Sequence, residues 1–392
     1  MKKYSILVVG INCYFGHISE FIINLKKKNP HVDITLITSP LPNDVSKDLQ
    51  EYTNRIVVFK AIGNRIVPKF LSKRINALLC YSQFLWLQLR NHFDIIDLHF
   101  VKPFIKYAMP VIKRMTRNVL ITPWGSDVLR VEDEKSIKEL TQIYSQARYI
   151  TTGKDTPTGK GVIAKFHVPA DKMVKLGWGG EFFDYIQENS RNVSIEEAKD
   201  RFGLNGRYVI TCGYNTQKSQ RHEEILKAIH SVKGELPDNL TLLIPCTYVF
   251  YRGMSEQKKQ YVEFLKEKGK ELGLDLIVVE EHLNISDLLK LRMATDIFVH
   301  IQSTDASSRS VMEYVACNKK LVHGAWVRYA YLEDNMPSCY FPVDRIENLG
   351  AVIVKAYQSE VKELPEGVIT AVKERGWNYR MTLWNNLFES LV

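Results

Sequence analysis

The sequence lacks the features that define membrane-spanning, disulfide-rich and low-complexity proteins. No apolar run approaches the ~18 residues that a bilayer-spanning helix needs, and the run at 5–10 that follows two lysines is too short for a signal peptide and is predicted to be a strand. Six cysteines are scattered along 392 residues with no close pair. This spacing favours neither a zinc site nor a disulfide framework, and it is typical of a protein in a reducing cytosol.

Acidic residues are scarce in the first half of the chain. Residues 1–180 hold 27 Lys and Arg against 14 Asp and Glu, a net charge of +13, whereas residues 181–392 hold 26 against 30, a net charge of −4. A basic half indicates an anionic partner, although a solvated basic surface would look the same. The sequence shows no basic–aromatic nucleic-acid motif, so we expect no nucleic acid partner and retain an anionic membrane surface as the candidate.

Strand-like and helix-like runs alternate along the whole chain, which predicts the α/β class with parallel sheets. The predicted strands include 119–122, 173–176, 240–245 and 276–279, and the last of them lies at 320–323. The length fits two domains, and a polar stretch at 188–193 is predicted to be the linker between them. We therefore predict an N-terminal domain at 1–187 and a C-terminal domain at 193–375. Residues 376–392 form a helix pattern with an apolar aromatic face, and we expect this helix to cross back and pack on the first domain.

The most informative stretch runs from Asp305 to Glu313 and has the sequence DASSRSVME. A buried strand is predicted just before this stretch, and a helix at 310–317 is predicted to begin inside it. Free backbone N–H groups and the positive end of that helix would then face a crevice. An anionic diphosphate fits such a place, and carboxylates can accept hydrogen bonds from hydroxyls. Ser307, Ser308, Arg309, Ser310 and Val311 are the candidate diphosphate contacts. A nucleotide-sugar combines both chemistries.

This pattern resembles the GT-B glycosyltransferases of family 4, in which two Rossmann-like, doubly wound domains face a central cleft. An acidic residue and a Glu eight positions later flank a small-residue turn in that family, as Asp305 and Glu313 do here. Further matches are the turn at 10–17, the strand at 94–99 that ends in a histidine, the junction at 177–183 and Gly213 after a strand. The departures are Asp for the usual Glu at 305, Tyr214 for an Arg, and Trp124 for a His.

The resemblance implies roles for individual residues. Glu313 would hold the ribose of the donor and Asp305 the hydroxyls of its sugar, while Lys218 and Arg221 would neutralise the departing diphosphate. The remaining candidates are Gly213 and Asn215 on the donor side, His17 and Asp127 as catalytic groups, and Gly16, His99 and Trp124 on the acceptor side. For each of the histidines, a structural role is the alternative, and for Lys218, Arg221 and Arg309 it is simple surface charge.

The function implied is transfer of a hexose or aminosugar from a nucleotide-sugar to a glycan or polyprenyl-linked acceptor in bacterial surface polysaccharide or glycoconjugate synthesis. Retention at the anomeric carbon and independence of metals and other cofactors follow from the resemblance, and the second half contains no Asp-x-Asp pair for Mg²⁺. Segment 215–222 resembles a turn of aminosugar transferases that act on lipid-linked enterobacterial glycans.

We expect a cytoplasmic protein with peripheral contact to the inner face of the cell membrane through its basic half. Within that half, Lys69, Lys73 and Arg74 stand beside aromatic residues, a pattern that suits either an anionic lipid surface or a buried helix with a basic start. Two other functions remain open. The departures at 124 and 214 permit a non-catalytic partner subunit of another transferase, and the same fold could serve a nucleotide-sugar epimerase.

Overall fold

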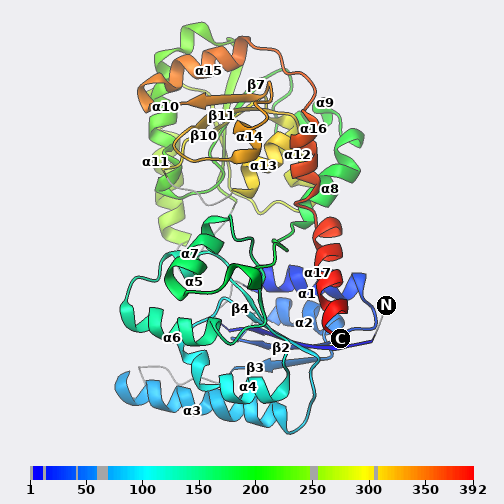
Figure 1. Ribbon diagram of the computed structural model, residues 1–392. Coiled ribbons are helices and arrows are strands. Elements are labelled where there is room, and N and C mark those ends of the chain that lie inside the picture. Colours follow the sequence, from blue (N-terminus) through cyan, green and yellow to red (C-terminus); the bar gives the residue numbers. More distant parts are fainter. Residues whose placement is uncertain (1–2, 12–14, 41–42, 60–68, 248–254, 304–307) are drawn as a thin grey trace. The chain divides into compact units, whose positions relative to one another are not determined.

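A computed structural model describes residues 3–11, 15–40, 43–59, 69–247, 255–303 and 308–392. The chain forms two compact units (Figure 1). Unit 1 comprises Met1–Gly180 and Trp377–Val392, and unit 2 comprises Glu181–Gly376. Each unit contains a six-stranded parallel sheet, so the prediction of two Rossmann-like α/β domains is confirmed.

Unit 1 is built on a parallel sheet whose central strands are buried on both faces, as strands between two layers of helices must be. Its strands are β1 (Ser5–Gly10), β2 (Asp33–Thr38), β3 (Arg55–Val58), β4 (Ile95–His99), β5 (Val119–Thr122) and β6 (Tyr149–Ile150). Its helices are α1 (Phe15–Lys28), α2 (Asn43–Tyr52), α3 (Lys69–Gln88), α4 (Met109–Met115), α5 (Ser126–Leu129), α6 (Glu134–Tyr144), α7 (Pro157–Phe166) and α17 (Trp377–Leu391). Helices α1, α2 and α17 cover one face of the sheet, and α3 to α7 cover the other.

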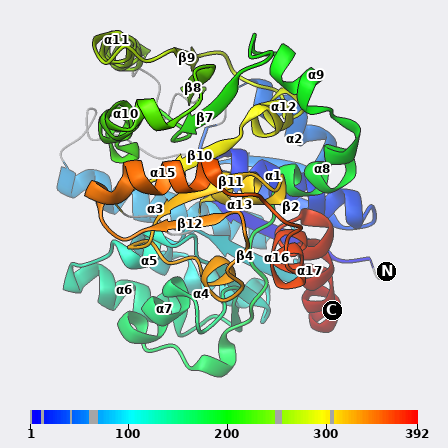
Figure 2. The ribbon, with the colours of Figure 1, turned by 90° about the horizontal axis from the view of Figure 1, so that it is seen from above.

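Unit 2 repeats this plan. Its strands are β7 (Tyr208–Cys212), β8 (Leu240–Pro245), β9 (Leu276–Val279), β10 (Ile297–His300), β11 (Lys320–Gly324) and β12 (Tyr340–Val343). Its helices are α8 (Glu181–Asn189), α9 (Ile195–Asp200), α10 (His222–Ser231), α11 (Ser255–Glu271), α12 (Ile285–Ala294), α13 (Arg309–Ala316), α14 (Ala330–Glu333), α15 (Leu349–Gln358) and α16 (Glu366–Lys373). Figure 2 shows α10, α11 and α15 on one side of the strands and α12 and α13 on the other.

Both sheets have the same strand order. In unit 1 it is β3-β2-β1-β4-β5-β6, and in unit 2 it is β12-β11-β10-β7-β8-β9. Counted from the first strand of each unit, both orders are 3-2-1-4-5-6, the dinucleotide-binding arrangement. The order reverses between β1 and β4 and between β7 and β10, so the crevices for ligands are expected at the carboxyl ends of these pairs.

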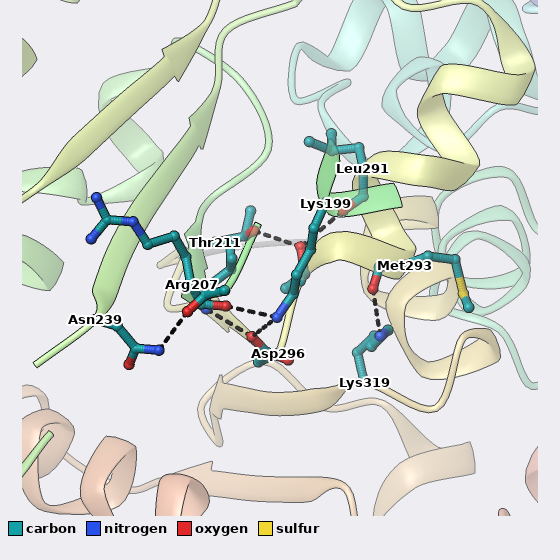
Figure 3. Close-up of polar contacts among 11 residues, drawn as sticks. Lys199, Arg207, Thr211, Asn239, Leu291, Met293, Asp296 and Lys319 are labelled. Atoms are coloured by element: carbon teal, nitrogen blue, oxygen red, sulfur yellow. Dashed lines mark hydrogen bonds and ion pairs between the residues drawn. The ribbon is translucent and has the colours of Figure 1, made fainter. Parts of the chain in front are cut away.

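The opposite, amino-terminal edge of the second sheet is fixed by polar contacts (Figure 3). Asp296, just before β10, accepts hydrogen bonds from the backbone N–H of Val209 at 2.8 Å and from the ammonium of Lys199 at 3.0 Å. The ammonium of Lys319 donates to the carbonyl of Met293 at 2.7 Å, and burial lowers the pKa of this ammonium. These contacts link the starts of β7, β10 and β11 to one another or to α9 and α12.

The structure differs from the sequence prediction in two places. The prediction assigned residues up to 187 to the first domain, whereas α8 belongs to unit 2 because Phe182 and Ile186 pack against Leu289. The segment 173–176 was predicted to be a strand, but it makes only an isolated bridge between Met173 and Ile150. The last helix, α17, packs in unit 1, as predicted. No helix in the described part of the chain is long and apolar enough to cross a membrane.

Helix α17 completes the core of unit 1 although it follows unit 2 in the sequence. Trp384 is fully buried, its ring lies 4.9 Å from that of Phe21 on α1, and its indole N–H donates to the Gly177 carbonyl at 3.2 Å. The apolar stripe predicted for residues 377–392 is thus satisfied by the α1 face of the first sheet.

We expect Trp384→Ala to lower the free energy of unfolding of unit 1 by about 3–5 kcal/mol, because it removes a fully buried ring and leaves a cavity. Urea denaturation followed by far-UV circular dichroism would measure the change. Asn386→Ala, on the exposed side of the same helix, should stay within ~0.5 kcal/mol of the wild type. Equal stability of the two variants would show that Trp384 of α17 does not stabilise the hydrophobic core of unit 1.

Candidate functional site

In unit 2, the turn after β7 begins at Gly213, whose φ of +63° favours glycine. A Cβ at this position would lie 2.7 Å from Nε2 of His222 and 2.9 Å from Oε1 of Gln220, so the side chains at and just before the start of α10 already fill the space. Gln220 Oε1 accepts the backbone N–H of Tyr214 at 3.1 Å. Asn215 is buried, and its Oδ1 accepts the backbone N–H of Gln217 at 2.8 Å. Gly213 and Asn215, both predicted donor contacts, therefore shape this loop.

The two predicted cations lie at the end of this loop. Lys218 is exposed, and Arg221 is half-buried at the start of α10 in the left-handed conformation, with φ of 57°. The guanidinium carbon of Arg221 lies 5.9 Å from the ring centroid of Trp326, which follows β11. Arg221 thus reaches from the α10 end toward the strands at the centre of the sheet, while Lys218 faces solvent.

Lys218 and Arg221 also line a cavity of about 630 Å³ between the amino-terminal parts of α10 and α11. Its other lining residues are His222, Glu223, Glu224, Gln257, Gln260, Tyr261 and Phe264. The rings of Tyr261 and Phe264 stack at 5.9 Å, and Nδ1 of His222 lies 3.0 Å from the Tyr261 hydroxyl. Burial lowers the pKa of His222 to about 4, so this imidazole is neutral at pH 7. No sequence pattern predicted that residues of α11 would line this cavity.

Gln302 joins the loop after β10 to the loop after β7, and it was missed by the sequence analysis. Its Oε1 accepts the Tyr214 hydroxyl at 3.1 Å, and its Nε2 donates to Ser219 Oγ at 3.1 Å. Its backbone carbonyl accepts the indole N–H of Trp326 at 2.7 Å. The side chains around the strand-order reversal are therefore held together by one buried amide.

Helix α13 begins close by, and Ser308 is its amino-terminal cap. Ser308 Oγ accepts the backbone N–H of Val311 at 3.4 Å, and the Ser308 N–H donates to the Tyr329 hydroxyl at 3.1 Å. Arg309 and Ser310 are half-buried in the first turn. Asp305 and Ser307, two of the predicted donor contacts, lie outside the described residues.

Glu313, the second acid of the predicted pair, is buried in an ion pair. The Nη2 and Nε of Arg292 on α12 donate to Glu313 Oε2 at 2.8 and 3.1 Å, and Nη1 donates to the Tyr314 hydroxyl at 3.0 Å. Oε1 of Glu313 accepts no hydrogen bond from the described residues. The carboxylate is thus oriented through one oxygen and can accept a hydroxyl through the other.

Arg375, just beyond the end of α16, lies near Arg309 at the start of α13. Burial lowers the pKa of its guanidinium, and the positive charge of the neighbouring Arg309 acts in the same direction. No described carboxylate lies within ion-pair distance of Arg375. Its position 62 residues after Glu313 gave the sequence analysis no reason to associate it with α13.

In unit 1, the carboxyl end of β4 carries a buried histidine. Nε2 of His99 lies 2.9 Å from Asp97 Oδ2, and the indole N–H of Trp124 lies 3.5 Å from Nδ1. Asp97 Oδ1 accepts the Thr122 hydroxyl at 2.7 Å, which in turn accepts the Thr151 hydroxyl at 2.9 Å. This chain of hydrogen bonds runs across β4, β5 and the end of β6. It favours the His99 tautomer that donates through Nε2.

Aromatic side chains surround His99 and reach the start of α1. His17 follows Gly16 there, and 38% of its side chain is exposed. Its ring meets those of Trp124 and Trp178 edge-on at 5.5 and 6.2 Å. The structure therefore brings three predicted residues, His17, His99 and Trp124, into one cluster of unit 1, and it adds Trp178.

Asp127 stabilises the turn that carries Trp124. Its Oδ1 accepts the backbone N–H of Trp124 at 2.9 Å, and its Oδ2 is buried without a hydrogen-bond partner among the described residues. Burial raises the pKa of this carboxyl to about 6, although the backbone hydrogen bond from Trp124 opposes the shift. Gly125 permits the turn because its φ is +100°. Asp127 is thus positioned to hold Trp124 in place.

Comparisons with known proteins identify the fold. No family model matches the sequence, and no curated protein matches it. Among solved structures, the chain is similar to a glycosyltransferase from Rickettsia africae with a TM-score of 0.73 and 14% identity, over 100% of this chain and 99% of that one. This is the GT-B fold.

Two further structures share the GT-B fold at similar distances. Anabaena HepE, solved in complex with UDP and glucose, has a TM-score of 0.64 and 13% identity over 99% of this chain and all of its own. The lipopolysaccharide outer core galactosyltransferase WaaB has a TM-score of 0.64 and 12% identity over the same shares. At these identities the similarity establishes the fold.

Asp127 should make the stability of unit 1 depend on pH. Its folded-state pKa of about 6 is above the ordinary value of 3.8, so the folded state binds the proton more tightly than the unfolded state. The stabilisation from this group is present below pH ~4 and is lost as the pH rises through 6, by at most about 3 kcal/mol. Asp127→Asn should remove this part of the pH dependence.

Urea denaturation of the wild type and of Asp127→Asn at pH 4.5 and 7.5 would measure this pH dependence of the free energy of unfolding. The wild type should lose stability relative to Asp127→Asn at the higher pH. A difference between the two proteins that does not change with pH would contradict the raised pKa.

Proposed function

We propose that the chain is a retaining, metal-independent glycosyltransferase that moves a hexose or aminosugar from a nucleotide-sugar to a glycan or polyprenyl-linked acceptor. The observation that carries the proposal is the GT-B fold, together with predicted site residues gathered at both places where strand order reverses. The UDP and glucose bound to Anabaena HepE support the class of donor. The lipopolysaccharide galactosyltransferase supports bacterial surface polysaccharide or glycoconjugate synthesis.

Unit 2 would hold the donor. Glu313, oriented by Arg292 through Oε2, would accept a ribose hydroxyl through Oε1, and Asp305 would take hydroxyls of the sugar. The start of α13 offers a positive helix end to the diphosphate. Arg309 and Arg375 add two cations beside it, and burial makes their attraction for an anion stronger than it would be in water.

In the transfer step, a bond forms between the acceptor oxygen and the anomeric carbon while the bond from that carbon to the β-phosphate oxygen breaks. The acceptor proton passes to the departing phosphate oxygen on the same face of the sugar, so configuration is retained. Negative charge grows on the diphosphate as it leaves. Lys218 and Arg221 would stabilise that charge in the transition state.

Unit 1 would receive the acceptor. The cluster of His17, His99, Trp124 and Trp178 offers aromatic faces on which sugar rings can pack, and His17 is its exposed polar group. The basic surface of the same half fits an acceptor on a polyprenyl diphosphate, for which the protein would contact the inner face of the cell membrane from the cytoplasm.

A screen of nucleotide-sugars by thermal shift tests the donor. The cognate compound at 100 times its dissociation constant should stabilise the protein by ~2.7 kcal/mol. Glu313→Gln should weaken that binding roughly 10- to 100-fold, because a hydrogen bond to a carboxylate is lost. Glu347→Gln, at an exposed surface pair, is the matched control and should bind as the wild type does. The absence of a shift from every nucleotide and nucleotide-sugar would sink the proposal.

Lys218→Ala should lower kcat by roughly 10²- to 10³-fold with the donor identified in that screen, because one cation that stabilises the departing diphosphate is lost. Lys227→Ala, which removes an exposed lysine of α10 that pairs with Glu223, should keep wild-type turnover. Release of the nucleoside diphosphate, measured with and without acceptor, reports the rate.

Turnover in EDTA should equal turnover without it if the reaction needs no metal. Wild-type rates in Lys218→Ala would remove Lys218 from the mechanism. If the protein converted the donor to its epimer without an acceptor, its function would be that of an epimerase and not of a transferase.

A further inference from the structure

Helix α3 carries large apolar side chains on its outward face, beside the exposed Arg74 and Ser82, as well as on its inward face. Cys80, Phe84 and Leu87 point into the core of unit 1 and are fully buried. The other side of the helix exposes 69% of Leu78, and 77% of Leu89 is exposed in the turn that directly continues it. A helix on the surface of a soluble protein usually carries charged residues on that side, so the burial of its inner face does not explain the outer one.

Two aromatic residues belong to the same outward face. Tyr81 and Trp86 are each 37% exposed, and the spacing 78, 81, 86, 89 places all four side chains on one side of the helix. The guanidinium carbons of Arg55, from the edge strand β3, and of Arg90 lie 4.4 and 5.0 Å from the Trp86 ring centroid. An indole contacted by two guanidiniums has an apolar body and a cationic border.

The described charges on and directly beside this face are basic. Arg55, Arg74 and Arg90 are exposed or half-buried there, and the segment 52–93 contains no Asp or Glu, although Glu51 and Asp94 flank it in the sequence. The helix α4, which packs beside α3, adds the exposed Lys113 and Arg114. Exposed cations on a solvated helix are commonly balanced by acids three or four positions away, and α3 has none.

We propose that the outer face of α3 docks on an anionic phospholipid bilayer and lies in the plane of the interface. Leu78 and Leu89 enter the acyl region, Trp86 lies at headgroup depth, and Arg55 and Arg90 contact lipid phosphates. Apolar side chains bordered by cations match a surface that is apolar beneath an anionic layer. A second copy of the same face would bring cations against cations, which argues against a dimer through α3.

Membrane docking would give the proposed glycosyltransferase a lipid partner. Only the step that places unit 1 beside a lipid-linked acceptor rests on the proposed function. Docking itself depends on the contacts of α3 and its neighbours. Binding to vesicles needs neither donor nor acceptor, so its outcome is independent of the donor screen. The two proposals can therefore fail separately.

Co-sedimentation of the full chain with vesicles tests the docking. Wild-type protein should pellet with vesicles of equal parts phosphatidylcholine and phosphatidylglycerol, remain in the supernatant with phosphatidylcholine alone, and be released as sodium chloride screens the charges. Leu78→Glu with Leu89→Glu should reduce partitioning by at least ~10-fold. Arg55→Gln with Arg90→Gln should reduce it roughly fivefold for each cation removed.

Ile195→Glu is the matched control, since it places an acid on an exposed apolar position of unit 2 and should bind as the wild type does. The melting temperature of each variant checks that it is folded, and the lipid and salt dependence of the wild type tests the proposal without any variant. Failure of the wild type to bind the anionic vesicles would overturn it. So would full binding by the double leucine variant, or a dimer in solution that this variant dissociates.

Discussion

The reversal of strand order between β7 and β10 is the constraint on which the candidate donor site depends. Right-handed crossovers carry α10 to one face of the second sheet and α13 to the other, so the loops after β7 and β10 must diverge at the carboxyl edge. The Gly213 N–H still bonds to the Val299 carbonyl at 3.0 Å. Beyond that bond, the amide of Gln302 links the two loops, so the sheet sets where their side chains lie.

Much of this fold could be predicted because parallel strands are buried on both faces. Strands at 119–122, 240–245 and 276–279 were predicted to the residue, since each is an apolar run between polar turns. Strand β12 was missed because it contains Pro342, which a ladder tolerates only at an edge such as this one. The return of α17 to unit 1 was predictable, since its aromatic stripe required an apolar partner.

Some residues of the candidate site could be predicted from the sequence, and others could not. Glu313 could be named from its spacing to Asp305, and His99 from its place at a strand end. Arg292 could not, because its pairing with Glu313 depends on how α12 packs against α13. The same holds for Arg375 and Gln302, whose contacts come from segments distant in sequence. The hydrogen bond from Trp124 to Asp127 and the burial of that carboxyl likewise appear only in three dimensions.

The buried pair of Arg292 and Glu313 is an unusual choice if stability were its only purpose. Removing two charges from water costs several kcal/mol for each ion, and well-packed apolar residues often replace such pairs without loss. Apolar side chains here would extend the surrounding core, yet the chain keeps a carboxylate with one oxygen bound and the other without a described donor. A carboxylate held in that way is preorganised to accept a hydroxyl, because the ligand need not offset the cost of orienting it. The ion pair therefore gives Glu313 the orientation that its proposed contact with a ribose hydroxyl requires.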